Sequence, residues 1–289
     1  MAKKSAHVHS IRDVLKVHPD GVDLARIDPA ATPVGPTSKS EAEKDLAAMA
    51  EELDRLQENL YAEGIGGGRR RVLVVLQGMD TSGKGGTIRH VAGLVNPQGL
   101  HIVSFKKPTR AELSHDFLWR IRRQVPGPGM IGFFDRSHYE DVLVPRVDKL
   151  VPPATWRARY QQINDFEAEL AEAGTTIVKC FLHISPERQK ERLVARLETP
   201  EKLWKYNPND LVVRAKWSQY QQAYGDLLTQ CSPESAPWYA VPSDRKWYRN
   251  WVVAQLLLQT LRDLEPTYPE PDYDPAAELS RLLEADPLR

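Results

Sequence analysis

The 289-residue sequence predicts an α/β fold built on a mostly parallel five-stranded sheet with helices on both faces. Five short apolar runs rich in β-branched or aromatic residues recur along the chain, and stretches long enough to form helices separate them. The first run is followed at once by the glycine-rich sequence GMDTSGKGGT, which is typical of a strand, loop and helix unit that binds phosphate. Strands that alternate with helices favour a parallel sheet covered on both faces.

The N-terminal region is expected to be an irregular arm over residues 1–40, because it is rich in Pro, His and charge without a clear period. From Glu41 apolar residues recur every three or four positions, which predicts an amphipathic helix that ends at the breaker GIGGGRRR. This helix would pack on the core or on a second subunit. The main domain is expected over residues 41–265, and residues 266–289 are expected to form a tail with a short helix.

The expected strands are RVLVVLQ (71–77), HIVSF (101–105), MIGFFD (130–135), TIVKCFLHIS (176–185) and WYAVP (238–242). The first is a continuous apolar run, as found in strands whose two faces are both covered. The last is the weakest of the five patterns.

The charge of the chain is balanced overall but segregated along the sequence. The 39 Lys and Arg residues equal the 39 Asp and Glu residues, which argues against a general nucleic-acid or membrane-surface binder. Between Arg69 and Arg123 there are eleven Lys or Arg and three Asp or Glu, whereas Asp263 to Asp286 holds eight acids and one Arg. We therefore expect an anionic ligand in the first region.

The two cysteines, Cys180 and Cys231, suggest neither a disulfide framework nor a zinc site. The N-terminus lacks the apolar segment of a signal peptide, and no apolar run approaches the roughly 18 residues that span a bilayer. We expect a soluble, cytoplasmic protein.

The glycine-rich loop matches the phosphate-binding pattern G-x-x-x-x-G-K, except that Gly85 stands where a hydroxyl residue usually follows the lysine. Glycines allow backbone N–H groups to surround phosphate oxygens, the following helix adds partial positive charge at its start, and Lys84 adds a full charge. The alternative is a purely structural turn. The loop residues expected to contact phosphate or nucleotide are Gly78, Thr81, Ser82, Gly83, Gly85, Gly86 and Thr87.

Two acids are the candidate metal ligands. Asp80 lies inside the loop, where a carboxylate would repel phosphate unless a divalent cation lay between them. Asp135 ends the third expected strand, the usual place of a second metal-binding acid, although it could instead cap a helix. Arg136 would then contact the transferred phosphoryl group. His138 and Tyr139 are interpreted as packing or positioning groups, because a phosphate nucleophile is already ionised and needs no base.

Five motifs in order resemble the type 2 polyphosphate kinases, and the resemblance covers about residues 40–265: GMDTSGKGG, FKKPTRAELSHDFLWR, FFDRSHYEDVLVPRV, EKLWKYNPNDLVVRAKWSQYQQAY and APWYAVPSDRKWYRNW. The resemblance implies a P-loop kinase fold similar to thymidylate kinase, with a helical lid at about 186–216. It also implies phosphoryl transfer between inorganic polyphosphate and nucleotides with Mg²⁺, for which Mn²⁺ could substitute. Members of the family are usually dimers or larger, so a homo-oligomer, dimer or tetramer, is expected.

The resemblance also assigns roles to residues. Asp80 and Asp135 are similar to the metal ligands, and Lys84 and Arg136 are similar to the phosphate-contacting cations. Further candidates for contact with the polyphosphate chain or the nucleotide are Lys106, Arg120, Arg188, Arg192, Arg196, Lys202, Lys205 and Arg214. The arginines at 188, 192 and 196 would share one helix face, and solvated ion pairs with nearby glutamates are the alternative for any of them.

The segment SHYEDVLV resembles the subgroup that accepts nucleoside mono- and diphosphates, which implies conversion of ADP to ATP and of AMP to ADP. Adenine nucleotides, and guanine nucleotides as further substrates, are the expected acceptors; base preference and direction stay open. One alternative is an ATP-dependent nucleoside or nucleotide kinase, which donor preference would distinguish. Another is a non-catalytic nucleotide-binding switch, for which the lid cations would be superfluous.

Overall fold

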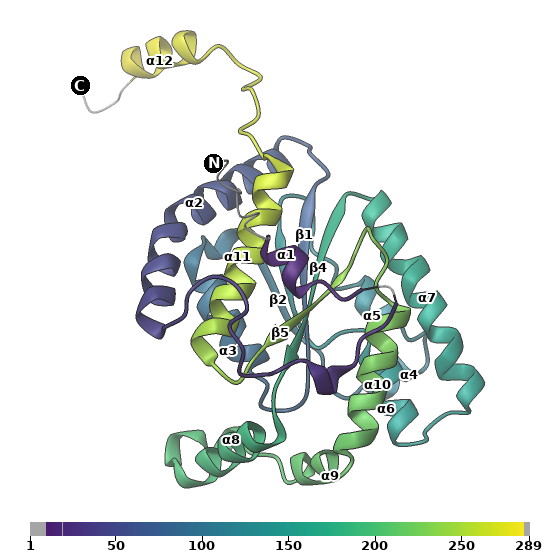
Figure 1. Ribbon diagram of the computed structural model, residues 1–289. Helices are drawn as coiled ribbons and strands as arrows, with labels where there is room; N and C mark the ends of the chain where they lie inside the picture. The colour runs from purple at the N-terminus through teal and green to yellow at the C-terminus, as the bar shows by residue number, and fades with distance from the viewer. Residues whose placement is uncertain (1–9, 19, 286–289) are drawn as a thin grey trace, which may run out of the picture.

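The structure, a computed structural model, describes residues 10–18 and 20–285 (Figure 1). Its described residues form a five-stranded sheet of order β2-β3-β1-β4-β5, in which every neighbouring pair is parallel. The strands are β1 Arg71–Gln77, β2 Leu100–Ser104, β3 Ile131–Asp135, β4 Thr175–His183 and β5 Trp238–Pro242. The predicted α/β class and the five predicted strands are confirmed.

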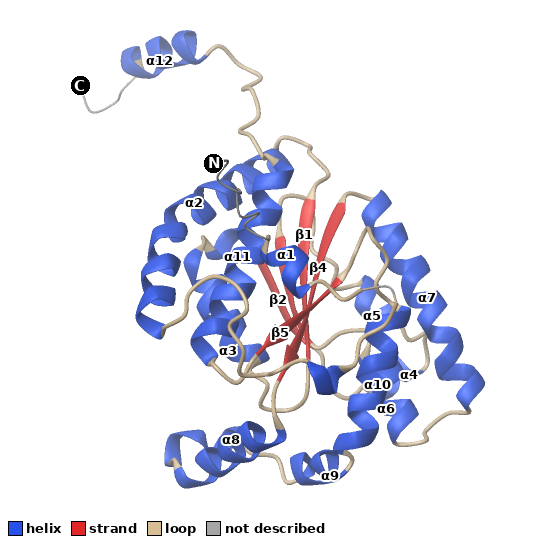
Figure 2. Cartoon of the chain, in the orientation of Figure 1, coloured by secondary structure: helices blue, strands red, loops and turns tan. Residues whose placement is uncertain are grey.

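Helices cover both faces of the sheet (Figure 2). On one face lie α2 Lys39–Ile65, α3 Lys84–Val91 and α11 Lys246–Leu264, and on the other lie α6 Glu140–Val147, α7 Pro153–Glu172 and α10 Trp217–Gln230. Strand β1 shows why both faces are apolar: alternate residues point to opposite sides, so Val74 packs into the first cluster and Val75 into the second.

Short helical segments complete the connections. They are η2 Ala92–Leu94, η3 Pro97–Gly99, α4 Arg110–Leu113 and α5 Trp119–Arg122. After β4 come three further segments, α8 Pro186–Glu198, η4 Pro200–Lys205 and α9 Asn209–Ala215, which lie together beyond the carboxyl end of the sheet in Figure 1. We call residues 186–216 the lid.

The N-terminal arm is less irregular than expected, as far as residues 10–18 and 20–40 show. It contains helix α1 Ile11–Leu15 and the turn η1 Leu24–Arg26. Apolar residues of α1 are buried against the core, and the backbone N–H of Val17 donates to the carbonyl of Trp238 in β5 at 2.8 Å. The arm therefore wraps the domain along β5; residues 1–9 lie outside the described part.

The C-terminal tail leaves α11 at Glu265, runs without regular structure and ends in α12 Pro275–Glu284, which stands apart from the domain in Figure 1. Because α11 follows β5 and packs back along the sheet, the tail emerges at the amino end of the strands, opposite the lid. Among the helices of the described residues, none is long and apolar enough to cross a membrane.

Candidate functional site

The loop between β1 and α3 needs two of its glycines for steric reasons. Gly78 has φ 147° and Gly83 has φ 112°, backbone conformations that L side chains rarely adopt. A Cβ atom on Gly83 would lie only 1.7 Å from a guanidinium nitrogen of Arg249. The loop therefore closes tightly, and α3 begins directly after it at Lys84.

Lys84 lies inside this loop. Its side chain is only 7% exposed, and its Nζ donates to the carbonyl of Gly78 at 2.8 Å and to that of Met79 at 3.4 Å. Burial lowers the pKa of Lys84, and the positive charge of Arg136 lowers it further. Three hydroxyl oxygens in and just after the loop are buried without a hydrogen-bond partner among the described residues: Thr81, Ser82 and Thr87. Such unpartnered polar atoms fit a site that binds phosphate oxygens and their metal.

The two predicted acids flank the loop from different elements. Asp80 lies within it, and its Oδ1 accepts from Nη2 of Arg136 at 2.5 Å. Asp135 ends β3, and its Oδ2 lies 3.7 Å from the position that a Cβ on Gly85 would take. The carboxylate of Asp135 thus faces the place where other loops of this pattern carry a hydroxyl.

A third acid, Glu140, was missed by the sequence analysis. It opens α6, and burial raises its pKa although the charges of Arg136 and Lys84 lower it. In return Glu140, followed by Asp80, holds the pKa of Arg136 above its ordinary value. The signal was present in the sequence, because an acid in the first helical turn after Asp135 must stay near the carboxyl end of β3.

Two arginines fix the outer side of the loop. Arg192, from the lid, donates to the carbonyls of Thr81 at 2.8 Å and Ser82 at 3.0 Å. Arg249, from α11, is 2% exposed and donates to the carbonyl of Ser82 at 3.0 Å. Burial lowers the pKa of Arg192 to about 10 and that of Arg249 to about 9. Sequence analysis predicted the first and missed the second.

These arginines belong to a larger group of like charges. Burial lowers the pKa of Lys246, at the start of α11, and neighbouring cations lower it further. We call the group the loop cation cluster; its members are Arg188, Arg192, Lys202, Lys246 and Arg249. Within the described residues, only Arg188 of these five forms an ion pair, with Glu191 on its own helix. Lys246 and Arg249 were missed, although the motif SDRKWYRN places three cations directly after β5.

Other predicted phosphate ligands contact protein groups in this structure, and their role at phosphate stays a prediction. Arg120 donates to the carbonyl of Lys106 at 2.8 Å and to Asp141 at 3.1 Å, and Arg196 donates to Asp210 at 3.2 Å. In the lid, Arg214 donates to Oε1 of Gln189 at 2.7 Å, and Gln189 in turn donates to the carbonyl of Asp80 at 3.1 Å. Lys106, Lys202 and Lys205 are exposed, and the ammonium of Lys205 lies 4.9 Å from the ring centre of Trp204.

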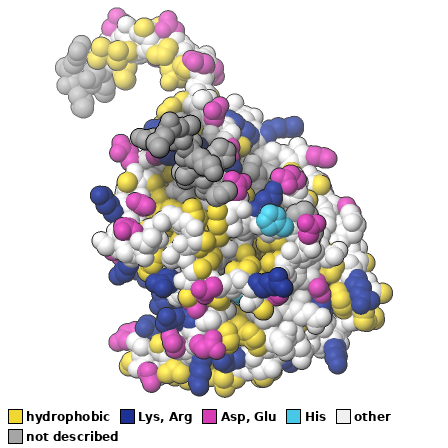
Figure 3. Space-filling view, viewed as in Figure 1, with side chains coloured by type: hydrophobic (Ala, Val, Ile, Leu, Met, Phe, Trp, Pro, Cys, Tyr) yellow, Lys and Arg dark blue, Asp and Glu magenta, His cyan; other side chains and the backbone are white. Residues whose placement is uncertain are grey.

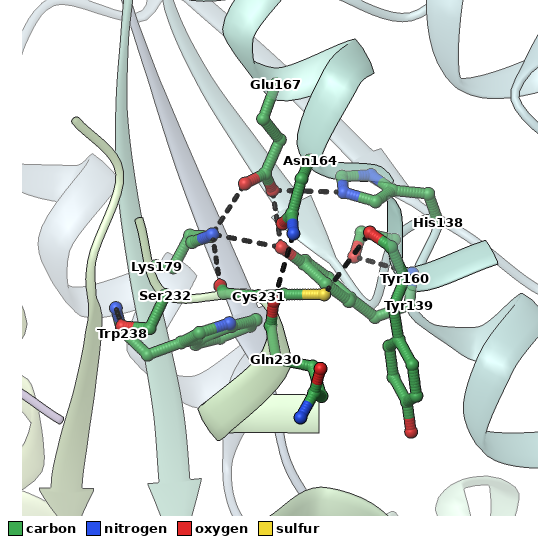
Figure 4. A network of polar contacts seen from close by, with 11 residues as sticks. His138, Tyr139, Tyr160, Asn164, Glu167, Lys179, Gln230, Cys231, Ser232 and Trp238 are labelled. Carbon is green, nitrogen blue, oxygen red and sulfur yellow. Dashed lines mark hydrogen bonds and ion pairs between the residues drawn. The ribbon is translucent and has the colours of Figure 1, made fainter. Parts of the chain in front are cut away.

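A buried polar network secures the chain that follows Arg136 (Figure 4). The ammonium of Lys179, on β4, donates to Glu167 at 2.5 Å, to the hydroxyl of Tyr139 at 3.0 Å and to the carbonyl of Cys231 at 2.8 Å. Glu167, on α7, also accepts from Tyr139 at 2.6 Å and pairs with His138 at 3.2 Å. Burial alone would raise the pKa of Glu167, but Lys179 and His138 outweigh it and hold the pKa low.

Asp80 and Asp135 are the acidic side chains predicted to bind a metal ion beside the loop. Within the described ranges, no group of three or more His, Cys, Asp and Glu side chains could hold a metal ion. Mg²⁺ bound to substrate phosphates typically takes only one or two protein carboxylates and fills its other positions with water and phosphate oxygens. A pair of aspartates beside a phosphate loop therefore fits Mg²⁺ and does not suit zinc.

Comparisons with known proteins agree with this geometry. The family model described as Polyphosphate kinase 2 (PPK2) matches residues 36–269. An AMP/ADP-polyphosphate phosphotransferase of Meiothermus ruber is 49% identical over 89% of this chain and 95% of its own length. An ADP-polyphosphate phosphotransferase of Rhodopseudomonas palustris is 42% identical over 81% and 83%, respectively.

A solved structure shares the fold almost completely. The crystal structure of polyphosphate kinase 2 from Arthrobacter aurescens TC1 matches with a TM-score of 0.93 and 48% sequence identity, over 96% of this chain and 98% of its own. Residues 1–264 make up about 91% of the 289-residue chain. The match covers 96% of it and therefore extends into the tail after Leu264.

Proposed function

This chain belongs to the polyphosphate kinase 2 family, and we propose that it uses Mg²⁺, Asp80 and Asp135 to phosphorylate both ADP and AMP from inorganic polyphosphate. Its activity is phosphoryl transfer between polyphosphate and nucleotides, as the names of its relatives indicate, which favours this reading over an ATP-dependent nucleotide kinase.

The loop cation cluster is the observation that supports a polyphosphate donor. Its cations lie close enough to lower the pKa of Lys246, so they repel one another in the free protein. Polyphosphate carries about one negative charge per phosphate, so a bound chain would replace the repulsion between these cations with attraction along its length. The site is therefore built for a long polyanion, and the donor would enter along α8 and the start of α11.

Lys84 and Arg136 hold the phosphoryl group that moves. Backbone N–H groups of the loop and Lys84 bind its oxygens, while Arg136 stays protonated because Glu140 and Asp80 hold its pKa high. Binding of phosphate requires Arg136 to exchange its contact with Asp80 for one with the substrate, which frees Asp80 to bind metal. When bound, Mg²⁺ neutralises charge on the phosphate oxygens.

Transfer is direct. A terminal oxygen of the acceptor nucleotide forms a bond to the last phosphorus of polyphosphate, the bridging P–O bond breaks, and its electron pair stays on the shortened chain. No protein base is required, because the attacking phosphate is ionised. Since the transition state of such transfers is loose, the residues act mainly by positioning the two phosphates in line and by neutralising charge.

One assay tests the proposed donor and acceptors together. Purified protein, Mg²⁺ and ADP are incubated with and without polyphosphate, and the nucleotides are separated by chromatography. We expect ATP only when polyphosphate is present; equal ATP formation without it would indicate disproportionation of ADP and would contradict the assignment.

The acceptor range is tested with AMP and polyphosphate in the complete absence of ADP. Support for AMP comes from the segment SHYEDVLV and from the similarity to the AMP/ADP-polyphosphate phosphotransferase of Meiothermus ruber. We expect ADP first and ATP later. If AMP gives no product while ADP does, the protein accepts diphosphates only, and the proposed use of AMP is wrong.

A further inference from the structure

The lid makes its most specific contacts on its inner side. Its outer surface carries acidic, basic and apolar side chains mixed together, as the lower edge of Figure 3 shows. On the inner side Gln189, an uncharged residue of α8, is 0% exposed and contacts both the phosphate loop and the second lid helix, α9. Contact with substrate does not explain this residue, because both ends of its amide bind protein groups.

The amide of Gln189 lies between an acceptor and a donor. Its Nε2 donates to the carbonyl oxygen of Asp80 at 3.1 Å, and its Oε1 accepts from Nη1 of Arg214, on α9, at 2.7 Å. A carbonyl oxygen only accepts and a guanidinium only donates, so the side chain between them must offer one N–H and one oxygen. Glutamine offers both, whereas an ionised glutamate offers only oxygens.

The contact with Asp80 sets the direction of a loop N–H group. The carbonyl of Asp80 and the N–H of Thr81 belong to one trans peptide plane, so they point in opposite directions. Because Gln189 holds the carbonyl toward the lid, the N–H of Thr81 points away from the lid, and it donates to no acceptor among the described residues. An N–H group held in this way can bind a phosphate oxygen.

The loop backbone needs this support at Thr81. Its φ is 65°, a left-handed conformation that is unfavourable for a β-branched residue. Such strained backbone persists only where the surrounding contacts hold it. The lid supplies two of them, because Gln189 binds the carbonyl before Thr81 and Arg192 binds the carbonyl of Thr81 itself. Two residues of α8 therefore hold the conformation of the loop.

Helix α9 connects this contact to the rest of the lid. Arg214 also donates to the carbonyl of Pro186 at 2.8 Å, which fastens α9 to the first turn of α8. One turn earlier on α9, burial raises the pKa of Asp210, and the charge of Asp80 raises it further, so this helix lies near the reaction site. A displacement of α9 would withdraw Arg214 and leave the amide of Gln189 free to turn.

We propose that Gln189 is a positioning residue that couples the lid to the phosphate loop. Arg214 aligns its amide, and the amide orients the peptide between Asp80 and Thr81, which supplies one N–H group for the donor phosphate and carries the carboxylate proposed to bind Mg²⁺. This role rests on the function proposed above, since that function gives the loop and Asp80 their tasks. The loop thus keeps its binding conformation only while α9 stays in place.

Steady-state formation of ATP from ADP and polyphosphate tests the contact. Gln189→Met keeps the length of the side chain but removes both hydrogen bonds, and we expect turnover at saturating substrates to fall about tenfold to a hundredfold. Gln189→Glu keeps the shape and an acceptor for Arg214, but it cannot donate to Asp80 while ionised and should be similarly impaired. Gln57→Met makes the same change at a buried glutamine of α2, beside η3, and should leave turnover unchanged.

A double-mutant cycle tests whether Arg214 acts through Gln189. Arg214→Met should lower turnover and leave the KM for polyphosphate nearly unchanged, whereas loss of a cation that binds the polyanion would raise that KM. If both residues act through one contact, the variant with both substitutions should stay within about twofold of Gln189→Met alone. Losses that multiply, or an effect of Arg214→Met on the KM alone, would overturn the coupling.

Urea unfolding of each variant separates a lost contact from a lost fold. If Gln189→Met does not fold, Gln189→Glu takes its place in the cycle, and the same criteria decide. A parent protein that forms no ATP from polyphosphate would overturn the proposed function and the role of Gln189 with it. An active parent whose Gln189 variants turn over equally fast would overturn the role of Gln189 alone.

Discussion

Two groups of charged side chains, one buried around Lys179 on β4 and one beside the phosphate loop, are organised in opposite ways. On β4, the ammonium of Lys179 donates to three acceptors, and the carboxylate of Glu167 accepts from Lys179 and Tyr139 and pairs with His138. At the phosphate loop, Arg192, Arg249 and Lys246 have lowered pKa values and form no ion pair within the described part of the chain.

The first arrangement is typical of a structural role, and the second is typical of a ligand-binding role. A buried pair whose hydrogen bonds are all made is complete without a ligand and fixes the backbone around it. Like charges gathered at one place reduce the stability of the free protein and are retained where an anion completes them. The charges at the loop are thus suited to the anionic ligand proposed above, whereas the network around Lys179 is complete and positions the segment that carries Arg136.

Asp80→Asn should have the largest effect on activity. The substitution keeps size but removes the charge that both pairs with Arg136 and is proposed to bind Mg²⁺. We expect turnover to fall at least about a thousandfold, which corresponds to about 4 kcal/mol of transition-state stabilisation. Steady-state kinetics over a range of Mg²⁺ and Mn²⁺ concentrations measure it.

The stability of this variant serves as its control. Because Asp80 lies at the loop and outside the core, urea unfolding should stay close to that of the parent, and more Mg²⁺ should recover part of the activity. A nearly normal enzyme with unchanged Mg²⁺ dependence would mean that Asp80 only shapes the turn and that Asp135 alone holds the metal.

The sequence was sufficient to predict the five strands, because each apolar run is buried in the structure as its local pattern indicates. RVLVVLQ is apolar at every position except its ends, and the structure buries its two faces under different helices. The order of strands is not written in any single pattern. The short helix in the arm was not predicted because α1 is only five residues long and is held by contacts with β5 and α11, which no local period reveals.

The candidate site was predictable where a motif fixes the backbone and was not where distant elements meet. The loop and Asp135 follow strands directly, so their place was set by the fold. Arg249 lies 166 positions after Gly83 in the sequence, yet its guanidinium occupies the space that a side chain at position 83 would need. Conversely, the sequence did not predict the contacts of Arg120 with Asp141 and of Arg196 with Asp210, because charge alone does not say which partner is nearer; their expected contact with phosphate stays a prediction.

Lys179→Met should have the largest effect on stability. Removing the ammonium leaves the carboxylate of Glu167 buried with only Tyr139 and His138 as donors. We expect the free energy of unfolding at pH 7 to fall by about 3 kcal/mol, at the lower end of the usual range for one partner of a buried pair, because those two donors remain. Urea denaturation followed by circular dichroism measures it.

A second substitution and a change of pH sharpen this result. Glu167→Gln added to Lys179→Met removes the stranded charge and should recover about 1 kcal/mol or more. In the parent protein the pKa of Glu167 is below its ordinary value of about 4.3, so its contribution is present above that pH and is lost as the pH falls through the lowered pKa. If both single and double variants unfolded like the parent, the network would contribute nothing to stability.

Lys246→Ala should distinguish the loop cation cluster from the network around Lys179, because it is expected to weaken polyphosphate binding without weakening folding. Loss of one member of the loop cation cluster relieves repulsion by Arg192 and Arg249, so the midpoint of unfolding should stay the same or rise slightly. The KM for polyphosphate should increase roughly tenfold, as expected for about 1.4 kcal/mol of lost attraction, while the KM for ADP changes little. Lys190→Ala, on the outer side of α8, is the control that removes a cation without facing the donor.

Gly85→Ser is expected to have the smallest effect, although it restores the common loop pattern. A Cβ at this position meets only Oδ2 of Asp135, at the ordinary contact distance of 3.7 Å, so the loop can accept the side chain. Serine in place of glycine in the first turn of α3 should stabilise the protein by a few tenths of a kcal/mol, up to about 0.5 kcal/mol.

Turnover should not rise above that of the parent and should fall by no more than about threefold, because Asp135 already faces this position and Asp80 supplies the second carboxylate. Parallel measurements of unfolding and of ATP formation test both halves. A clear gain in turnover would show that the loop lacks a metal ligand that the two aspartates do not replace.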